Sequence, residues 1–122
     1  IDMTVKIGIN GLGRIGRMVI RSIVENKNKN IEIKHINNRT ELKNISQLLK
    51  YDSNHGKFNA KISYNNKNII INNKKISYSR ETEINKINWK KFGVDIVLEC
   101  TGKNNSKEKS FQHIKNGARK VI

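Results

Sequence analysis

The chain has 122 residues, enough for one compact domain, and its apolar residues occur in dense runs that could form a core. No run approaches the roughly 20 apolar residues that span a bilayer, so we expect no membrane partner. Cys100 is the single cysteine, which excludes an internal disulfide. The sequence does not open on a charged and then apolar segment with a small-residue cleavage site, so we do not expect secretion. These features predict a cytoplasmic protein.

The net charge of +15 invites comparison with nucleic-acid-binding proteins. Surfaces that bind phosphate backbones usually cluster Lys with Arg among aromatic side chains. Here 19 Lys are spread along the whole chain beside 19 Asn, and Arg occurs only 6 times. We therefore expect a solvated basic surface and no nucleic-acid partner, and a non-enzymatic nucleic-acid-binding module stays as an alternative supported by charge alone.

The first third of the chain has the pattern of a β-α-β unit. Residues 5–10 (VKIGIN) form a β-branched apolar run that ends at a turn signal, Asn10-Gly11. A helical period follows from Arg14, and residues 31–36 (IEIKHI) return to strand-like alternation. The expected apolar face of the helix carries Ile15, Met18, Val19 and Ile23, and another face carries Arg14, Arg17 and Arg21. Two strands joined by one helix should be parallel.

The middle of the chain predicts a second helix and then a small antiparallel meander. The helix spans residues 41–50, with Thr40 as its N-cap and its apolar side on Leu42, Ile45, Leu48 and Leu49. Short strands are expected at residues 58–64, 68–71 and 75–78, separated by Asn65-Asn66 and Asn72-Asn73. Asparagine tolerates the left-handed backbone that tight hairpins need.

The last third of the chain predicts a return to alternating strands and helices. Residues 80–93 are expected to form a short helical turn and a loop, and residues 94–100 (VDIVLEC) a buried strand. A helix over residues 106–116 should end with Gly117 at its C′ position, before a strand that begins at residue 118. Met3 has the position of a natural start and Ile122 falls inside a strand, so we expect the first part of a longer protein.

The motif Gly11-Leu12-Gly13-Arg14-Ile15-Gly16 is a G-x-G-x-x-G between an expected strand and an expected helix. Gly11 would allow the tight turn, Gly13 the approach of a pyrophosphate to the backbone, and Gly16 the close packing of helix on strand. Amide groups at the helix N-terminus would then bind phosphates. The motif therefore predicts dinucleotide binding, with a glycine-rich turn that binds nothing as the alternative.

Four segments of the chain resemble the glyceraldehyde-3-phosphate dehydrogenase family, in its order and at close to its spacing. They are residues 6–17 (KIGINGLGRIGR), 50–58 (KYDSNHGKF), 93–102 (GVDIVLECTG) and 117–122 (GARKVI). The resemblance implies an α/β fold of Rossmann type, a doubly wound and mostly parallel sheet with a small antiparallel insertion. Residues 1–122 would be an incomplete dinucleotide-binding domain for NAD, with the catalytic domain beyond the chain.

The resemblance also implies the activity of the parent protein, a phosphorylating oxidoreductase of glycolysis and gluconeogenesis that forms a homotetramer. In that family a cysteine thiolate attacks the aldehyde, hydride passes to the nicotinamide, and inorganic phosphate releases the acyl group from a thioester. The reactive cysteine lies in a Ser-Cys-Thr-Thr-Asn-Cys segment that this chain does not reach. We therefore assign no catalytic residue and expect residues 1–122 to be inactive alone.

The family's cofactor contacts can be carried over by position. Asn10, Gly11, Gly13, Arg14 and Ile15, with Gly16 behind them, would line the pyrophosphate, although Arg14 could be an exposed helix-start arginine and Ile15 a core residue. Thr101 and Gly102 would lie in the crevice at the strand ends, unless they form only a helix-entry turn. Arg80 would lie near the adenine, but the segment after it is about two residues longer than in the family, so an ordinary solvated arginine is equally supported.

One departure from the family concerns the acidic residue expected to bind the ribose. Asn37, Asn38 and Arg39 stand where the family usually has Asn-Asp. Asn38 can bond the 2′-hydroxyl without a charge, and Arg39 could pair with a 2′-phosphate, so NADP becomes a second cofactor to consider. The alternative is that Asn38 caps the following helix.

The remaining chemically active side chains predict no further site. Cys100 lies in an apolar run without a basic partner, so we expect a structural thiol. His35, His55 and His113 are not spaced for a metal with other ligands, and no metal site is predicted. The nucleotide-binding pattern is also compatible with erythrose-4-phosphate dehydrogenase, which shares it, and with a free-standing nucleotide-binding regulatory module.

Overall fold

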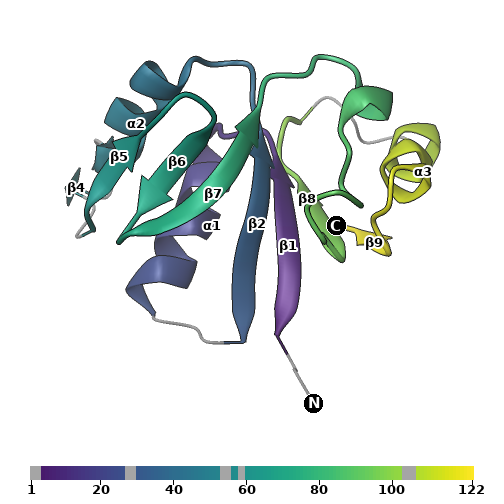
Figure 1. Ribbon diagram of the computed structural model, residues 1–122, viewed down its shortest axis with the longest axis horizontal. Helices are drawn as coiled ribbons and strands as arrows, with labels where there is room; N and C mark the ends of the chain where they lie inside the picture. The colour runs from purple at the N-terminus through teal and green to yellow at the C-terminus, as the bar shows by residue number, and fades with distance from the viewer. Residues whose placement is uncertain (1–3, 27–29, 53–55, 58–59, 103–106) are drawn as a thin grey trace.

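The computed structural model describes residues 4–26, 30–52, 56–57, 60–102 and 107–122, which form one α/β unit (Figure 1). The strands are β1 (Val5–Asn10), β2 (Ile31–Asn37), β3 (Tyr51–Asp52), β4 (Gly56–Lys57), β5 (Ile62–Tyr64), β6 (Asn68–Ile71), β7 (Lys74–Ser79), β8 (Ile96–Glu99) and β9 (Lys120–Val121). The helices are α1 (Arg14–Glu25), α2 (Leu42–Lys50), α3 (Lys107–Lys115) and the short 3₁₀ turn η1 (Ile84–Lys86). Met3, His55, Phe58 and Ser106 lie outside the described residues.

A seven-stranded sheet organises the fold, in the order β5-β6-β7-β2-β1-β8-β9. The pairs β7/β2, β2/β1, β1/β8 and β8/β9 are parallel, and the pairs β5/β6 and β6/β7 are antiparallel. The prediction of a mostly parallel sheet with a small antiparallel insertion is confirmed. The strands β3 and β4 form a separate antiparallel pair.

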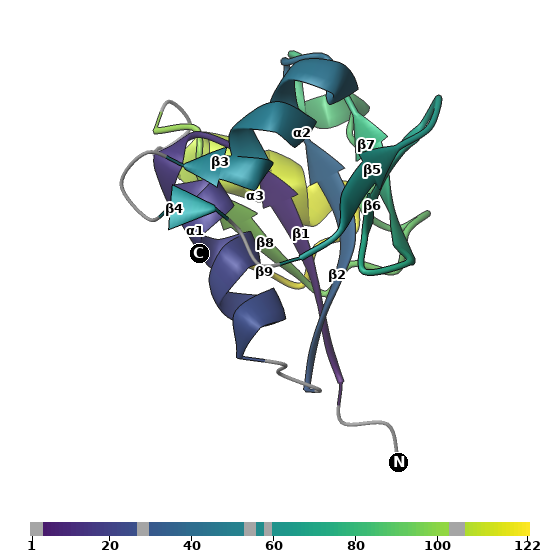
Figure 2. The ribbon, with the colours of Figure 1, turned by 90° about the vertical axis from the view of Figure 1, so that its left-hand side faces the viewer.

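Both faces of the sheet are covered, as alternate residues of β8 show. Ile96 and Leu98 pack against the larger core, to which α1, α2 and the meander also contribute. Val97 between them belongs to a second core with Trp89 and Val94. Neighbouring residues of a strand point to opposite faces, so the two cores lie on the two sides of the sheet. Figure 2 shows α1 and α2 on one side of the strands.

Trp89 packs on the second face of the sheet because Gly8 of β1 has no side chain and leaves room for the indole. A Cβ atom on Gly8 would lie 2.4 Å from a ring carbon of Trp89, so any larger residue would displace the indole. The indole is fully buried, and Phe92 from the same loop stacks on His35 of β2 with ring centroids 3.9 Å apart. The segment between β7 and β8 therefore serves as a packing layer in place of a long helix.

The expected apolar face of α1 is partly wrong. Ile15 and Met18 are 67% and 42% exposed, whereas Arg21 is only 9% exposed. Gly16 sets this orientation, since a Cβ there would lie 2.3 Å from the carbonyl oxygen of Gly11. The helix turns its glycine toward the strand end, which brings Ile20 into the core and leaves Ile15 outside.

Two details of the middle segment also differ from expectation. Glu41 and not Thr40 is the N-cap of α2, and Leu48 is 44% exposed although Ile45 and Leu49 are buried as predicted. The turn at Asn72-Asn73 has positive φ at both residues, as predicted for a tight hairpin. The turn at Asn65-Asn66 is closed by the Asn65 amide, which donates to the Asn68 carbonyl, and by Asn65 Oδ1, which accepts the amides of residues 67 and 68.

Helix α3 ends as predicted, with Gly117 at C′ in a Schellman arrangement. The Gly117 amide donates to the carbonyl of Ile114 and the Ala118 amide to that of His113, both at 3.1 Å. The φ angle of Gly117 is 114°, and a Cβ there would lie 2.5–2.7 Å from Lys90 atoms, including its backbone. The helix end and the Lys90 backbone therefore both require glycine.

We expect Gly117→Ala to lower the free energy of unfolding by about 3 kcal/mol, because it combines a left-handed alanine with a backbone clash. Gly93→Ala is the matched control, since Gly93 has φ 70° but no described atom within 4 Å of its Cβ position. It should cost only about 1 kcal/mol. Urea unfolding measures both values, and equal losses would contradict the role of the Lys90 contact.

Within the described residues no helix is both long enough and apolar enough to cross a membrane.

Candidate functional site

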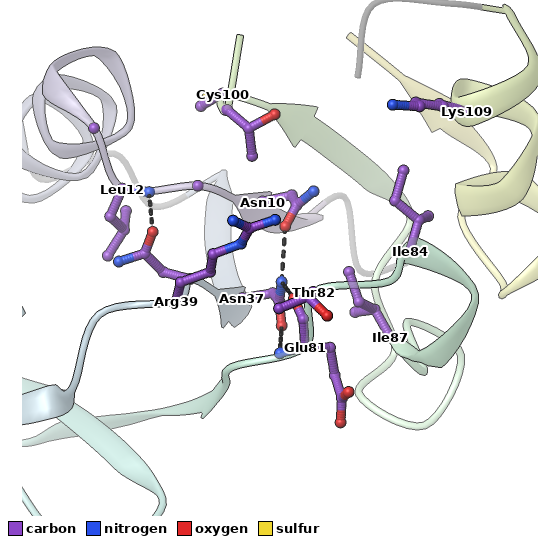
Figure 3. Close-up of a pocket in the computed structure, with 14 residues that line it drawn as sticks. Asn10, Leu12, Asn37, Arg39, Glu81, Thr82, Ile84, Ile87, Cys100 and Lys109 are labelled. Carbon is purple, nitrogen blue, oxygen red and sulfur yellow. Dashed lines mark hydrogen bonds between the residues drawn. The ribbon is translucent and has the colours of Figure 1, made fainter. Parts of the chain in front are cut away.

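Three neighbouring parallel strands end in polar residues at the same edge of the sheet. Asn37 ends β2, Asn10 ends β1 and Glu99 ends β8, in the spatial order β2-β1-β8. A cavity of about 340 Å³ opens there (Figure 3). Its lining consists of Asn10, Gly11, Leu12, Gly13, Asn37, Asn38, Arg39, Glu81, Thr82, Ile84, Ile87, Cys100, Thr101 and Lys109. Ligands of open α/β sheets bind in such a crevice at the carboxyl ends of the strands.

The three glycines of the β1–α1 loop are required for three different reasons. Gly11 has φ 97°, and a Cβ there would lie 2.7 Å from Thr101 Cγ2. Gly16 is pressed against the Gly11 carbonyl. Gly13 has extended backbone angles, and no atom of the described residues lies within 4 Å of its Cβ position. Nothing in the described fold demands glycine at 13, so the open space above it fits a ligand that approaches the backbone.

The N-terminus of α1 faces this cavity without a side-chain cap. Gly13 is the N-cap residue, its carbonyl accepts the Arg17 amide at 3.0 Å, and no side chain of the described residues caps the first turn. The first amides of a helix and its partial positive charge favour an anion. A 12-residue helix that starts at an uncapped glycine loop therefore suits a phosphate group.

Asn38 contacts the glycine loop directly. Its Oδ1 accepts the Leu12 amide at 3.0 Å, so it does not cap α2, and the capping role considered for it from sequence is wrong. Burial raises the pKa of Tyr78, and a hydrogen bond from the Asn38 side chain to its hydroxyl opposes that rise. Asn38 therefore has its second amide N–H to offer a ligand. Figure 3 shows the Arg39 side chain reaching from the same strand end toward Asn10. Arg80 is exposed, and its Nε donates to the Arg39 carbonyl at 2.8 Å.

Glu99 is the centre of a buried hydrogen-bond network that sequence analysis missed. Its side chain is 5% exposed. Oε1 accepts from Asn10 Nδ2 at 2.7 Å and from His113 Nε2 at 2.8 Å, and Oε2 accepts from the Thr101 amide at 3.1 Å and its hydroxyl at 2.7 Å. Burial raises the pKa of Glu99, but the hydrogen bonds from His113, Asn10 and Thr101 outweigh it and lower the pKa to about 2. The carboxylate is therefore ionised at neutral pH.

The network continues from the strand ends in both directions. Asn37 Nδ2 donates to Asn10 Oδ1 at 2.9 Å, and Asn37 Oδ1 accepts from the Ser79 hydroxyl at 2.6 Å. At the other end Trp89 Nε1 donates to His113 Nδ1 at 2.9 Å. The sequence signal that could have indicated this network is Glu99 near the end of the apolar run VDIVLEC. A buried carboxylate needs several hydrogen-bond donors.

Cys100 and the described histidines have structural environments. Burial, and then the charge of Glu99, raise the pKa of the Cys100 thiol, which disfavours the reactive thiolate. Burial, and then the charge of Lys91, lower the pKa of His35 to about 4. Within the part of the chain that the structure describes, no group of three His, Cys, Asp or Glu side chains could hold a metal ion.

The structure brings half of the residues predicted for the site into one place. Those that line the cavity are Asn10, Gly11, Gly13, Asn38 and Thr101, with Arg39 beside them. Those predicted for the site but outside its lining are Arg14, Ile15, Gly16, Arg80 and Gly102. Ile15 is exposed rather than in the core, and Gly16 serves helix packing. Glu81, Thr82, Ile84, Ile87 and Lys109 line the cavity without having been predicted.

Comparison with known proteins shows one family to which the chain is similar. A family model described as "Glyceraldehyde 3-phosphate dehydrogenase, NAD binding domain" matches residues 5–107. The chain is 45% identical over 117 residues to glyceraldehyde-3-phosphate dehydrogenase of Thermotoga maritima, which covers 96% of this chain and 35% of that protein. It is 43% identical over 120 residues to the enzyme of the same name from Geobacillus stearothermophilus, covering 98% and 35%. The chain therefore spans about a third of the length of these relatives.

Proposed function

Because the chain belongs to the family of glyceraldehyde 3-phosphate dehydrogenase NAD-binding domains, we propose that it is the cofactor-binding part of a phosphorylating glyceraldehyde-3-phosphate dehydrogenase. The observation that carries the proposal is the open space over Gly13, at the uncapped start of α1. Bound NAD supplies the hydride acceptor of such an enzyme. The residues of this chain bind and orient it.

Different residues of this chain bind different parts of the cofactor. The loop amides and the start of α1 face the pyrophosphate, with Gly13 admitting it close to the backbone. Asn38 reaches the adenosine ribose from the end of β2, and Thr101 bounds the cavity at the end of β8. Catalysis needs the thiol of a further domain, so residues 1–122 alone should not oxidise the aldehyde.

The contacts of Asn38 extend the proposal to NADP. The Leu12 amide occupies Oδ1 and the Tyr78 hydroxyl takes one N–H, so the group that Asn38 offers a ribose substituent is its second amide N–H. A donor suits a 2′-phosphate, and the Arg39 guanidinium beside it supplies positive charge. The carboxylate expected at position 38 in relatives of this pattern would repel that phosphate.

Asn38→Asp in the full-length protein is therefore expected to raise the preference for NAD over NADP about tenfold or more, as a ratio of kcat/KM values. One carboxylate oxygen can keep the bond to the Leu12 amide, and the other becomes an acceptor for the ribose hydroxyl. Arg39→Leu serves as the companion variant, since it should weaken NADP use and leave NAD use within about twofold. An unchanged or lower preference in Asn38→Asp would contradict the NADP proposal.

The proposal also covers the parent protein's aldehyde substrate, its oligomeric state and its location in the cell. We place the parent protein in the cytoplasm as a homotetramer. Erythrose-4-phosphate dehydrogenase is the competing function, since its nucleotide-binding pattern is the same. Full-length protein assayed with both aldehydes should prefer glyceraldehyde 3-phosphate in kcat/KM, and a preference for erythrose 4-phosphate would overturn this choice.

A further inference from the structure

The buried carboxylate of Glu99 joins three segments of the chain beside the cavity. It ends β8 beside the cavity, and its two oxygens bond to three separate segments of the chain. These are the end of β1, the turn after β8 and helix α3. Ionised carboxylates are rarely buried unless several groups donate to them. A group held this firmly fixes the relative positions of the segments that it joins.

The donors around Glu99 require a carboxylate and no other side chain. Asn10 Nδ2, His113 Nε2 and the Thr101 amide and hydroxyl each donate to it. Glutamine has one oxygen and one NH₂ group in place of two oxygens. Its NH₂ group would therefore point at hydrogen-bond donors of the site and find no acceptor there. Glu99→Gln therefore keeps the shape of the side chain and breaks the match of hydrogen bonds.

Thr101 links this network to the glycine loop. The Cβ position of Gly11 lies 2.7 Å from Thr101 Cγ2 and 2.9 Å from its amide nitrogen. The two residues pack directly on one another, and both line the cavity. Any shift of Thr101 therefore displaces the loop that precedes α1, where the phosphates are proposed to bind.

His113 and Trp89 act on Glu99 from outside the cavity. Neither lines it, and both are fully buried. The indole N–H of Trp89 can only donate, so His113 Nδ1 accepts and His113 Nε2 carries the proton that is donated to Glu99. Trp89 thus sets the tautomer of His113, and His113 orients the carboxylate.

We infer that Glu99, oriented by His113, is a positioning residue that sets the affinity for the dinucleotide by fixing Thr101 and Asn10 around Gly11. The inference depends on the proposed function, because it concerns the same cavity. It assigns helix α3 a role in cofactor binding through contacts that do not touch the cofactor.

The test uses the full-length protein and two substitutions at position 113. Leucine removes the donor to Glu99, whereas glutamine can place an amide N–H near the position of His113 Nε2. His113→Leu and Glu99→Gln should each raise the NAD dissociation constant and the KM for NAD about tenfold, with kcat at saturating NAD within about twofold. His113→Gln should stay within about threefold of the wild type. Calorimetric titration gives the dissociation constants.

Ile69→Ala is the control for a loss of stability alone, since Ile69 is fully buried in β6 and does not line the cavity. It should unfold more easily and bind NAD normally. If His113→Leu does not fold, Trp89→Phe replaces it, because that change removes the indole N–H that donates to His113 and keeps an aromatic ring in the second core. Wild-type affinity in Glu99→Gln and in the folded variant of this pair would overturn the inference. A wild-type protein that binds no NAD would overturn the proposed function itself.

Discussion

Alanine at position 13 is expected to weaken NAD binding by about a hundredfold, which corresponds to about 2.7 kcal/mol. Gly13 has extended backbone angles that any residue adopts, and in the described part of the chain its Cβ position has no neighbour within 4 Å. The added methyl group would occupy the space through which the pyrophosphate approaches the loop. Because it contacts none of the described residues, the free energy of unfolding should fall by no more than about 1 kcal/mol, the cost of alanine at a helix N-cap.

The neighbouring glycine gives the opposite result and serves as the control. A Cβ at Gly16 would lie 2.3 Å from the Gly11 carbonyl oxygen, so Gly16→Ala should destabilise the fold. Urea unfolding and calorimetric titration on both variants separate the two effects. Unchanged NAD affinity in Gly13→Ala would show that no ligand comes close to this residue.

The second large effect is a loss of stability in mild acid that comes from His35. Burial holds its pKa at about 4, against an ordinary value of 6.5, so the unfolded chain takes up the proton first as the pH falls. The stabilising contribution is complete above about pH 6.5 and is lost as the pH falls toward 4. The shift of about 2.5 pKa units predicts a loss of about 3 kcal/mol over this range.

Urea unfolding between pH 7.5 and 4.5 measures this loss, and His35→Asn identifies its source. The variant forfeits the stacking of the imidazole on Phe92 and its hydrogen bonds to Ser77 and Ser79, so it is less stable at neutral pH. Its stability should nevertheless change much less with pH. Glu99 contributes in a lower window, from its ordinary pKa of 4.5 down to about 2. An equal slope in both proteins would contradict the assignment to His35.

Local signals in the sequence were enough to predict the order of the helices and strands along the chain. The run VKIGIN and the turn at Gly11 predicted β1, and Asn72-Asn73 predicted a hairpin with two left-handed residues. Gly117 was placed at the end of α3 from its position in the sequence alone. Each of these features depends on the backbone preferences of a few adjacent residues.

Features that depend on contacts beyond a single helix or strand could not be predicted in this way. The apolar period of α1 placed Ile15 in the core, but the contact of Gly16 with the Gly11 carbonyl turns Ile15 outward. The bond from Asn38 to the Leu12 amide joins residues 26 apart, and the bond from Asn10 to Glu99 joins residues 89 apart. Such pairs follow from the order of the strands in the sheet, which the sequence pattern of a single element does not contain.

A crystal structure of the full-length protein with NAD tests the central claim most directly. The account predicts pyrophosphate oxygens within hydrogen-bond distance of main-chain amides at the start of α1, above Gly13. The adenosine ribose should lie against Asn38. Clear density for NAD at another place, with the glycine loop closed over the space above Gly13, would contradict the account.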